Sequence, residues 1–167
     1  YSVEYPSNFT LIGAMNPCPC GYYNHPTKEC SCQPFAINRY FSRISGPLLD
    51  RIDMHIEVVP VPLSELSGEQ VEESSAEIRK RVVAARDIQS RRFKGTSIHS
   101  NAMMNSAMLR KFCPLSSEVR SLLENAMSRL NLSARAYDRI IKVARTIADL
   151  AGVENIEAMH IAEAINY

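Results

Sequence analysis

The sequence has no long hydrophobic run and no excess of charge of one sign. No apolar stretch approaches the ~20 residues that a membrane-spanning helix needs. The 167 residues carry a net charge of +1, so net charge gives no reason to expect binding to nucleic acid or to a membrane. The opening residues, YSVEYPSNF, have neither the basic start nor the apolar core of a secretory signal. We therefore expect a cytoplasmic protein with no membrane partner.

Glycine is also scarce. None of the six glycines opens a G-x-x-x-x-G-K-[ST] motif, the loop whose backbone N–H groups cradle phosphates. The sequence also contains no β-strand that ends in the acidic residue used to hold magnesium beside such a loop. We therefore expect that this chain alone does not hydrolyse ATP.

Composition divides the chain at about residue 64. Residues 1–64 hold eight of the nine prolines and four of the five cysteines. Here Phe9–Met15 is apolar on both faces, as in a parallel sheet, and residues 54–58 alternate as in a half-buried strand. A helix is predicted around residues 34–45, ended by Gly46-Pro47. Since two strands and one helix cannot readily close an α/β layer, we expect part of a larger sheet whose other half lies upstream.

Residues 65–167 are predicted to be helical almost throughout. Apolar residues at helical spacing predict helices over about 69–92 and 119–130, and a third that Ser133 caps and Gly152 ends. A last helix is expected after Asn155. The predicted fold class is therefore α/β plus all-α, with a sheet portion in residues 1–64 and a helical domain in residues 65–167.

Four cysteines form two Cys-x-Cys pairs in a loop of residues 18–32, namely Cys18, Cys20, Cys30 and Cys32. Four thiolates so close in sequence suit a tetrahedral structural zinc ion, with no open position for a substrate. Disulfides and free thiols are the alternatives, and the absence of a secretion signal disfavours disulfides. His25 lies in the loop and could replace one cysteine, although a surface role is the simpler interpretation. Cys113 is expected to be a small buried apolar residue.

Asn16 follows the first predicted strand and precedes a proline. Ligands of open α/β sheets bind beyond the carboxyl ends of the strands, where an amide can orient a water or contact a phosphate. The alternative is structural, because Asn-Pro commonly starts a turn.

Two arginines occupy positions that local rules do not explain. Arg51 follows Asp50 in SGPLLDRID, just before the second predicted strand, where a solvated or salt-bridged arginine is the plain alternative. Arg135 lies in the first turn of the helix that Ser133 caps, where the helix dipole disfavours a cation by ~0.3–1 kcal/mol. Such a position suits a phosphate ligand, so we expect Arg135 to be exposed and poorly paired. Arg139 is interpreted as plain surface, and Arg145 is given no role.

Three stretches together resemble the magnesium-chelatase-related AAA+ ATPases, within them the ComM/YifB-like bacterial branch: LIGAMNPCPCGYY, RYFSRISGPLLDRIDMHIEV and LSARAYDRIIKVARTIADLAG. The cysteine insertion favours that branch over the chelatase subunits. The resemblance implies that Asn16 is sensor 1, that Arg51 is an arginine finger reaching a neighbouring subunit, and that Arg135 is sensor 2 on the lid. It also implies a parent ATPase that uses ATP and magnesium, forms a homo-oligomeric, hexameric ring and acts as a DNA motor in natural transformation.

Two other functions are kept open. The stretch RKRVVAARDIQSRRFK has seven basic residues and one acidic residue, which would suit a zinc-stapled module that binds nucleic acid without an ATPase role. Alternatively, glutamates just upstream balance a solvated helix face. A chelatase-type motor acting on a metal-insertion partner is the second possibility.

Overall fold

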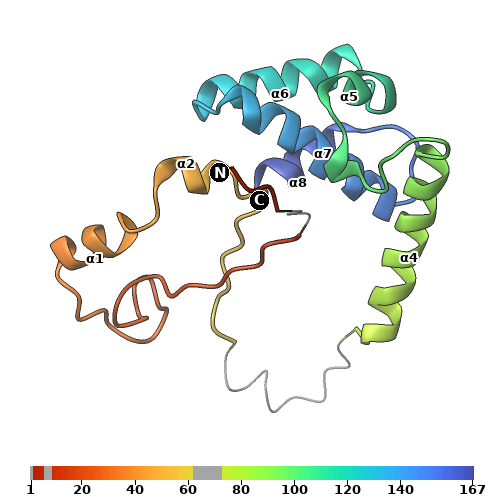
Figure 1. The fold of residues 1–167 in the computed structure, drawn as a ribbon. Helices are drawn as coiled ribbons and strands as arrows, with labels where there is room; N and C mark the ends of the chain where they lie inside the picture. The colour runs from red at the N-terminus through yellow and green to blue at the C-terminus, as the bar shows by residue number, and fades with distance from the viewer. Residues whose placement is uncertain (1, 6–8, 62–72) are drawn as a thin grey trace. The chain divides into compact units, whose positions relative to one another are not determined.

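The computed structural model describes residues 2–5, 9–61 and 73–167, which form seven α-helices and one short 3-10 helix (Figure 1). These residues belong to two compact units. One comprises Tyr1–Leu49 and Val58–Pro60, and the other comprises Asp50–Glu57 and Val61–Tyr167. Within the described ranges, no helix has the length and apolar character to cross a membrane.

The first unit contains two short helices, α1 (Pro34–Phe41) and α2 (Gly46–Leu49). The helix predicted around residues 34–45 is confirmed, but it ends at Phe41, with Ser42 as its C-cap, before the predicted boundary. Gly46-Pro47 starts α2 and does not close α1. Proline fits this place because the first turn of a helix makes no use of its missing N–H.

The expected sheet is not present among the described residues, none of which is in a strand. Residues 9–15 are extended, and Phe9, Leu11 and Ile12 are 75, 71 and 89% exposed. A strand forms only where its N–H and C=O groups pair with a neighbouring strand. Neither this segment nor residues 54–58 has such a neighbour among the described residues. Pro60 and Pro62 were expected to end the second strand or to mark an edge, and Pro62 lies outside the described residues.

The second unit is a helical bundle, as predicted. Its elements are α4 (Ser75–Arg92), the 3-10 helix η1 (Asn101–Met103), α5 (Ser106–Phe112), α6 (Ser117–Arg129), α7 (Ala134–Leu150) and α8 (Ala158–Ile165). Helix α7 is central, because it packs against α8, α4, η1 and α5. Leu123, Ile140 and Ile161 are among the buried core side chains. Cys113 is also buried, as expected, and loss of hydration raises its pKa to about 11.

Helix boundaries follow the capping residues. Helix α4 begins later than predicted, because the Ser74 side chain accepts from the Glu77 N–H and the Glu77 carboxylate accepts from the Ser74 N–H. These bonds hold the pKa of Glu77 below its usual value. The predicted ends of α7 are confirmed: Ser133 Oγ accepts from the Ala136 N–H at 3.3 Å, and Gly152 has a φ of +71°.

A buried ionic network fixes α4 and η1 to the C-terminal end of α7. The Asp149 carboxylate, 2% exposed, accepts two hydrogen bonds from Arg92 at 2.5 and 2.6 Å and one from Asn101 at 2.8 Å. Arg145 Nε donates to the same carboxylate at 3.1 Å, and Arg145 Nη2 donates to the Val153 carbonyl at 2.7 Å. The prediction that gave Arg145 no role is therefore wrong, since its guanidinium is part of the packed interior.

Candidate functional site

The four cysteines of the loop converge in the first unit. Their sulfur atoms all lie within 4.8 Å of one another, and the Sγ–Sγ distances from Cys18 are 3.3 Å to Cys20 and 3.7 Å to Cys30. Cys18 is buried, and the other three thiols are half-buried. The sequence prediction that these residues come together is confirmed.

Tight turns bring the two cysteine pairs together. Gly21 N–H donates to the Cys18 carbonyl at 3.0 Å, and Gly21 adopts a φ of +84°, which a residue with a side chain rarely accepts. His25 has a different task. Its Nδ1 accepts from the Thr27 and Lys28 N–H groups at 3.2 and 3.1 Å. His25 therefore shapes the loop and is not one of the clustered side chains.

The distances between the sulfur atoms fit a tetrahedrally coordinated metal ion and do not fit a disulfide. Disulfide sulfurs lie about 2.05 Å apart, whereas all five cysteines of the chain are free. Four thiolates at ~2.3 Å from a central zinc lie ~3.8 Å from one another, close to the separations found here. The donor set is therefore able to hold a metal ion such as zinc, and four protein ligands would close the site.

Hydrogen bonding and burial give the four thiols different pKa values. The Tyr22 N–H, followed by the Cys18 thiol, lowers the pKa of Cys20 to about 5. Loss of hydration raises the pKa of Cys32 to about 12. Four thiolates cannot form side by side without a compensating cation, because each charge opposes the next.

Asn16 lies beside this loop, in the first unit. Its side chain is exposed, and its Cγ and Nδ2 atoms are 4.0 Å from the position that a Cβ on Gly21 would take. The amide therefore sits against the turn that forms the cysteine cluster. The other two predicted site residues, Arg51 and Arg135, lie in the second unit.

In the second unit, the segment that carries Arg51 is fixed to the start of α7. The Asp50 carboxylate accepts from Arg135 Nη1 at 2.9 Å and from Ser133 Oγ at 3.1 Å. Arg139 Nη1 donates to the Asp50 and Ile52 carbonyls at 3.3 and 2.7 Å. The backbone is thus held on both sides of Arg51, whose side chain is exposed.

These contacts correct two predictions. Arg135 is exposed, as expected, but it is paired: its side chain is 58% exposed and that of Asp50 is 37% exposed. The carboxylate offsets the unfavourable cation at the helix start. Arg139 is not plain surface, since it anchors two carbonyls of the Arg51 segment. Its spacing of four residues from Arg135, which puts both on one helix face, is the signal that could have identified it.

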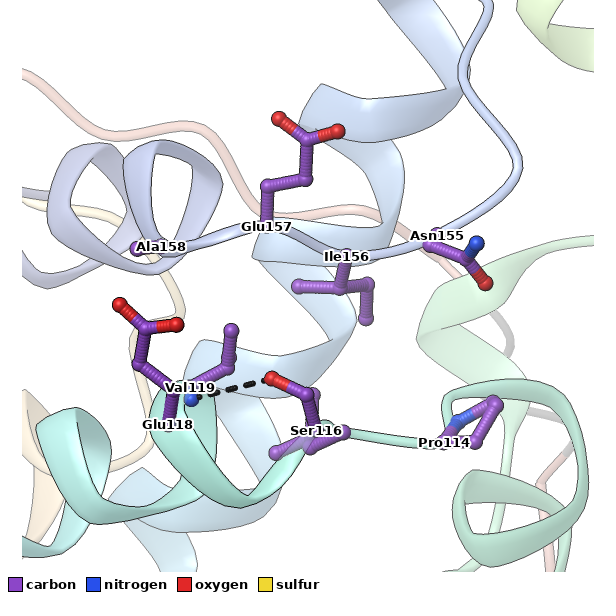
Figure 2. A pocket seen from close by; sticks show the side chains of 9 residues that line it. Pro114, Ser116, Glu118, Val119, Asn155, Ile156, Glu157 and Ala158 are labelled. Atoms are coloured by element: carbon purple, nitrogen blue, oxygen red, sulfur yellow. Dashed lines mark hydrogen bonds between the residues drawn. The ribbon is translucent and has the colours of Figure 1, made fainter.

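A groove of about 600 Å³ lies between the starts of α6 and α8 (Figure 2). Helix starts attract anions, but Glu118 and Glu157 line this groove and no basic side chain does. Ser116 Oγ already accepts from the Val119 N–H at 3.2 Å. The groove is therefore unsuited to a phosphate, and the start of α7 is the better candidate.

The basic stretch of α4 is partly neutralised. Arg81 pairs with Glu73 at 2.9 Å, and Arg92 is engaged by the buried Asp149. Four glutamates were expected to balance this helix, namely Glu69, Glu72, Glu73 and Glu77, and the first two lie outside the described residues. These pairs agree with a solvated helix face for Arg81 and with a packing role for Arg92.

Comparison with known proteins shows which family this chain belongs to. Residues 72–167 match the family described as magnesium chelatase, subunit ChlI C-terminal, and residues 1–66 match magnesium chelatase, subunit ChlI. The chain therefore belongs to the magnesium-chelatase ChlI family. The helical bundle of the second unit corresponds to the C-terminal domain of that family.

Individual relatives narrow the comparison to one branch. Competence protein ComM of Haemophilus influenzae is 42% identical over 167 residues, which are 99% of this chain and 31% of that protein. Protein YifB of Escherichia coli is 42% identical over 166 residues, 99% of this chain and 32% of that protein. A Mycobacterium tuberculosis protein is 33% identical over 163 residues, which are 98% of this chain and 32% of that protein. The chain thus spans about a third of the length of the curated relatives it matches.

Proposed function

We propose that this chain is the C-terminal portion of a ring-forming AAA+ ATPase. Asn16 would orient the attacking water as sensor 1, and Arg51 would stabilise transition-state charge in a neighbouring subunit as an arginine finger. Arg135 would contact the phosphates of its own subunit as sensor 2. The loop that binds ATP and the ligands of magnesium would come from the rest of a longer, cytoplasmic protein.

The observation that supports this proposal most is the attachment of the Arg51 segment to the start of α7. Asp50 binds Arg135, and Arg139 holds the carbonyls on either side of Arg51. An arginine finger must be presented at a fixed place, because its effect depends on reaching charge that develops only in the transition state. Two anchored carbonyls and an exposed side chain between them meet that requirement.

The cysteine cluster has a separate, structural role in this proposal. We assign Cys18, Cys20, Cys30 and Cys32 to one zinc ion that fixes the loop next to Asn16. The closeness of the four sulfur atoms supports a closed structural site, because four protein ligands complete the tetrahedral coordination of zinc.

For the whole protein, we propose a hexameric DNA motor that acts in natural transformation. The support is the similarity to a competence protein, together with the ring-forming ATPase character that the resemblance to magnesium-chelatase-related AAA+ ATPases implies. The family description also keeps a chelatase-type motor with a metal-insertion partner as a second candidate. Capture of DNA or of a chelatase-like partner by the full-length protein would separate the two.

The arginine finger can be tested in mixed rings of the full-length protein. Arg51→Ala should abolish ATP hydrolysis and leave ATP binding nearly unchanged, because the finger acts on a neighbour's nucleotide. A variant of the P-loop lysine should be inactive for the opposite reason. Mixing the two should restore partial hydrolysis, since some interfaces then combine one intact half from each variant.

Steady-state ATP hydrolysis at several mixing ratios provides the measurement. Mass spectrometry under native conditions should first show that the rings contain both variants. Confirmed mixed rings that remain inactive at every ratio would argue against a finger acting between subunits.

A further inference from the structure

The start of α7 is an anion site that the chain itself fills. Arg135, the Ser133 hydroxyl and the positive end of a 17-residue helix converge there. The anion they hold is the Asp50 carboxylate, bound at 2.9 Å by Arg135 and at 3.1 Å by Ser133. In the proposed function, a phosphate of ATP must engage the same Arg135 guanidinium.

The Asp50–Arg135 ion pair is weak enough for a phosphate to replace the Asp50 carboxylate at Arg135. Its two side chains are 58% and 37% exposed, and exposed ion pairs contribute ~0–1 kcal/mol. A triphosphate carries more charge and more acceptor oxygens than one carboxylate, so it competes well for a planar guanidinium. Breaking the pair costs little, yet it removes one of the contacts that hold the Arg51 segment.

We infer that Asp50 is a positioning residue that competes with phosphate for Arg135 and so couples two nucleotide sites. With no nucleotide bound, Asp50 holds Arg135 and keeps the Arg51 segment against α7. When phosphate takes Arg135, Asp50 loses its ion pair, and the segment is held less firmly, through Ser133 and Arg139. The occupancy of one subunit's site thereby changes the presentation of Arg51 to its neighbour. This inference rests on the proposed roles of Arg51 and Arg135.

The test measures the affinity of the full-length protein for a fluorescent, non-hydrolysable ATP analogue. Asp50→Asn keeps the shape of the side chain and can still accept from Ser133, but it loses the charge that holds Arg135. We expect binding to tighten by up to about fivefold, which corresponds to the ~1 kcal/mol upper value of an exposed pair. In an Arg135→Ala background, the same substitution should leave the affinity unchanged.

Asp53→Asn is the matched control. Asp53 is an exposed aspartate three positions along, and it has no hydrogen bond or ion pair with the described residues. The Asp53→Asn substitution should leave the affinity for the ATP analogue unchanged. Asp50→Ala should tighten binding as Asp50→Asn does, and circular dichroism checks that both remain folded.

Coupling needs a second readout, because a merely structural Asp50 would not affect a neighbour's catalysis. In mixed rings, Asp50→Asn subunits should donate Arg51 less effectively while their own sites still bind and hydrolyse ATP. If wild type does not bind the analogue, the proposed function fails, and this inference fails with it. If wild type binds but Asp50→Asn does not tighten binding, or tightens it equally without Arg135, only the role of Asp50 is overturned.

Discussion

At the residue scale, two arginines of the same helix, Arg135 and Arg145 of α7, differ in their exposure and in their contacts. Arg135 is exposed beside one carboxylate, whereas Arg145 is 2% exposed and contacts a carboxylate and two carbonyls. Burial lowers the pKa of Arg145, and Asp149 counteracts that effect. Within the described residues, no buried side-chain nitrogen or oxygen lacks a partner. The same residue type thus packs in the interior at one end of the helix and forms an exposed ion pair at the other.

Removing the charge at the centre of the buried network should destabilise the bundle. We expect Asp149→Asn to lower the free energy of unfolding by ~3–5 kcal/mol, because Arg92 and Arg145 would lose their shared carboxylate. Urea unfolding followed by circular dichroism measures the change. Glu124→Gln, at an exposed position on α6, is the control and should change stability by less than ~0.5 kcal/mol. Equal effects of the two substitutions would contradict a stabilising network.

Sequence reasoning predicted the exposure of Arg135 but missed both its ion pair with Asp50 and the burial of Arg145. Arg145 and Asp149 stand four positions apart on the apolar face of α7, which is a usable signal for an internal ion pair. The partner Arg92 is 57 positions away from Asp149, so no local pattern predicts it. Asp50 was visible only as the neighbour of Arg51, since its contact with Arg135 depends on how the bundle folds.

At the element scale, the long helices follow from periodicity and capping. Helix α7 begins and ends where Ser133 and Gly152 predict. Helix α5, with seven residues, and η1, with three, were missed. Such short elements carry about two turns or fewer of apolar pattern, and packing against α7 determines them. The clustering of the cysteines could be predicted because all four lie within residues 18–32 of the sequence.

Metal binding should determine whether the cysteine loop of residues 18–32 holds one fixed conformation. Purified protein should contain about one zinc per chain, and a strong chelator should remove it and increase proteolysis near residues 18–32. Cys30→Ser should abolish stoichiometric zinc, because it removes one of four ligands, while Cys113→Ser should retain it. Elemental analysis and thiol titration measure both effects. Metal-free native protein with four freely titrating thiols would refute a zinc site.

At the scale of the whole molecule, the two parts of the chain differ in how complete their packing is. The helical unit has a continuous buried core. The first unit leaves Phe9, Leu11 and Ile12 largely exposed in an extended segment. Relatives are about three times longer, and we propose that the remainder of such a protein pairs with this segment as a sheet. The sequence predicted the strand character, but strand formation requires a partner.

Hydrogen exchange can test that pairing. Backbone amides of residues 9–15 should exchange at least about tenfold more slowly in the full-length protein than in this chain, because sheet hydrogen bonds would protect them. Amides of α7 should be protected in both. Equal exchange at residues 9–15 in the two proteins would contradict the proposed sheet.

The contacts at the two ends of α7 have a mechanical consequence. Its 17 residues span about 25 Å, with the Asp50 segment held at one end and α4 clamped by the Arg92–Asp149–Arg145 network at the other. Contacts with other segments therefore hold the helix at both of its ends. If the end beside Arg135 stays in place while the axis tilts by about 10°, the far end moves about 4 Å over that length, and α4 must move with it. If phosphate replaces Asp50 at Arg135 as we propose, such a tilt would carry that change to α4 at the other end of the helix.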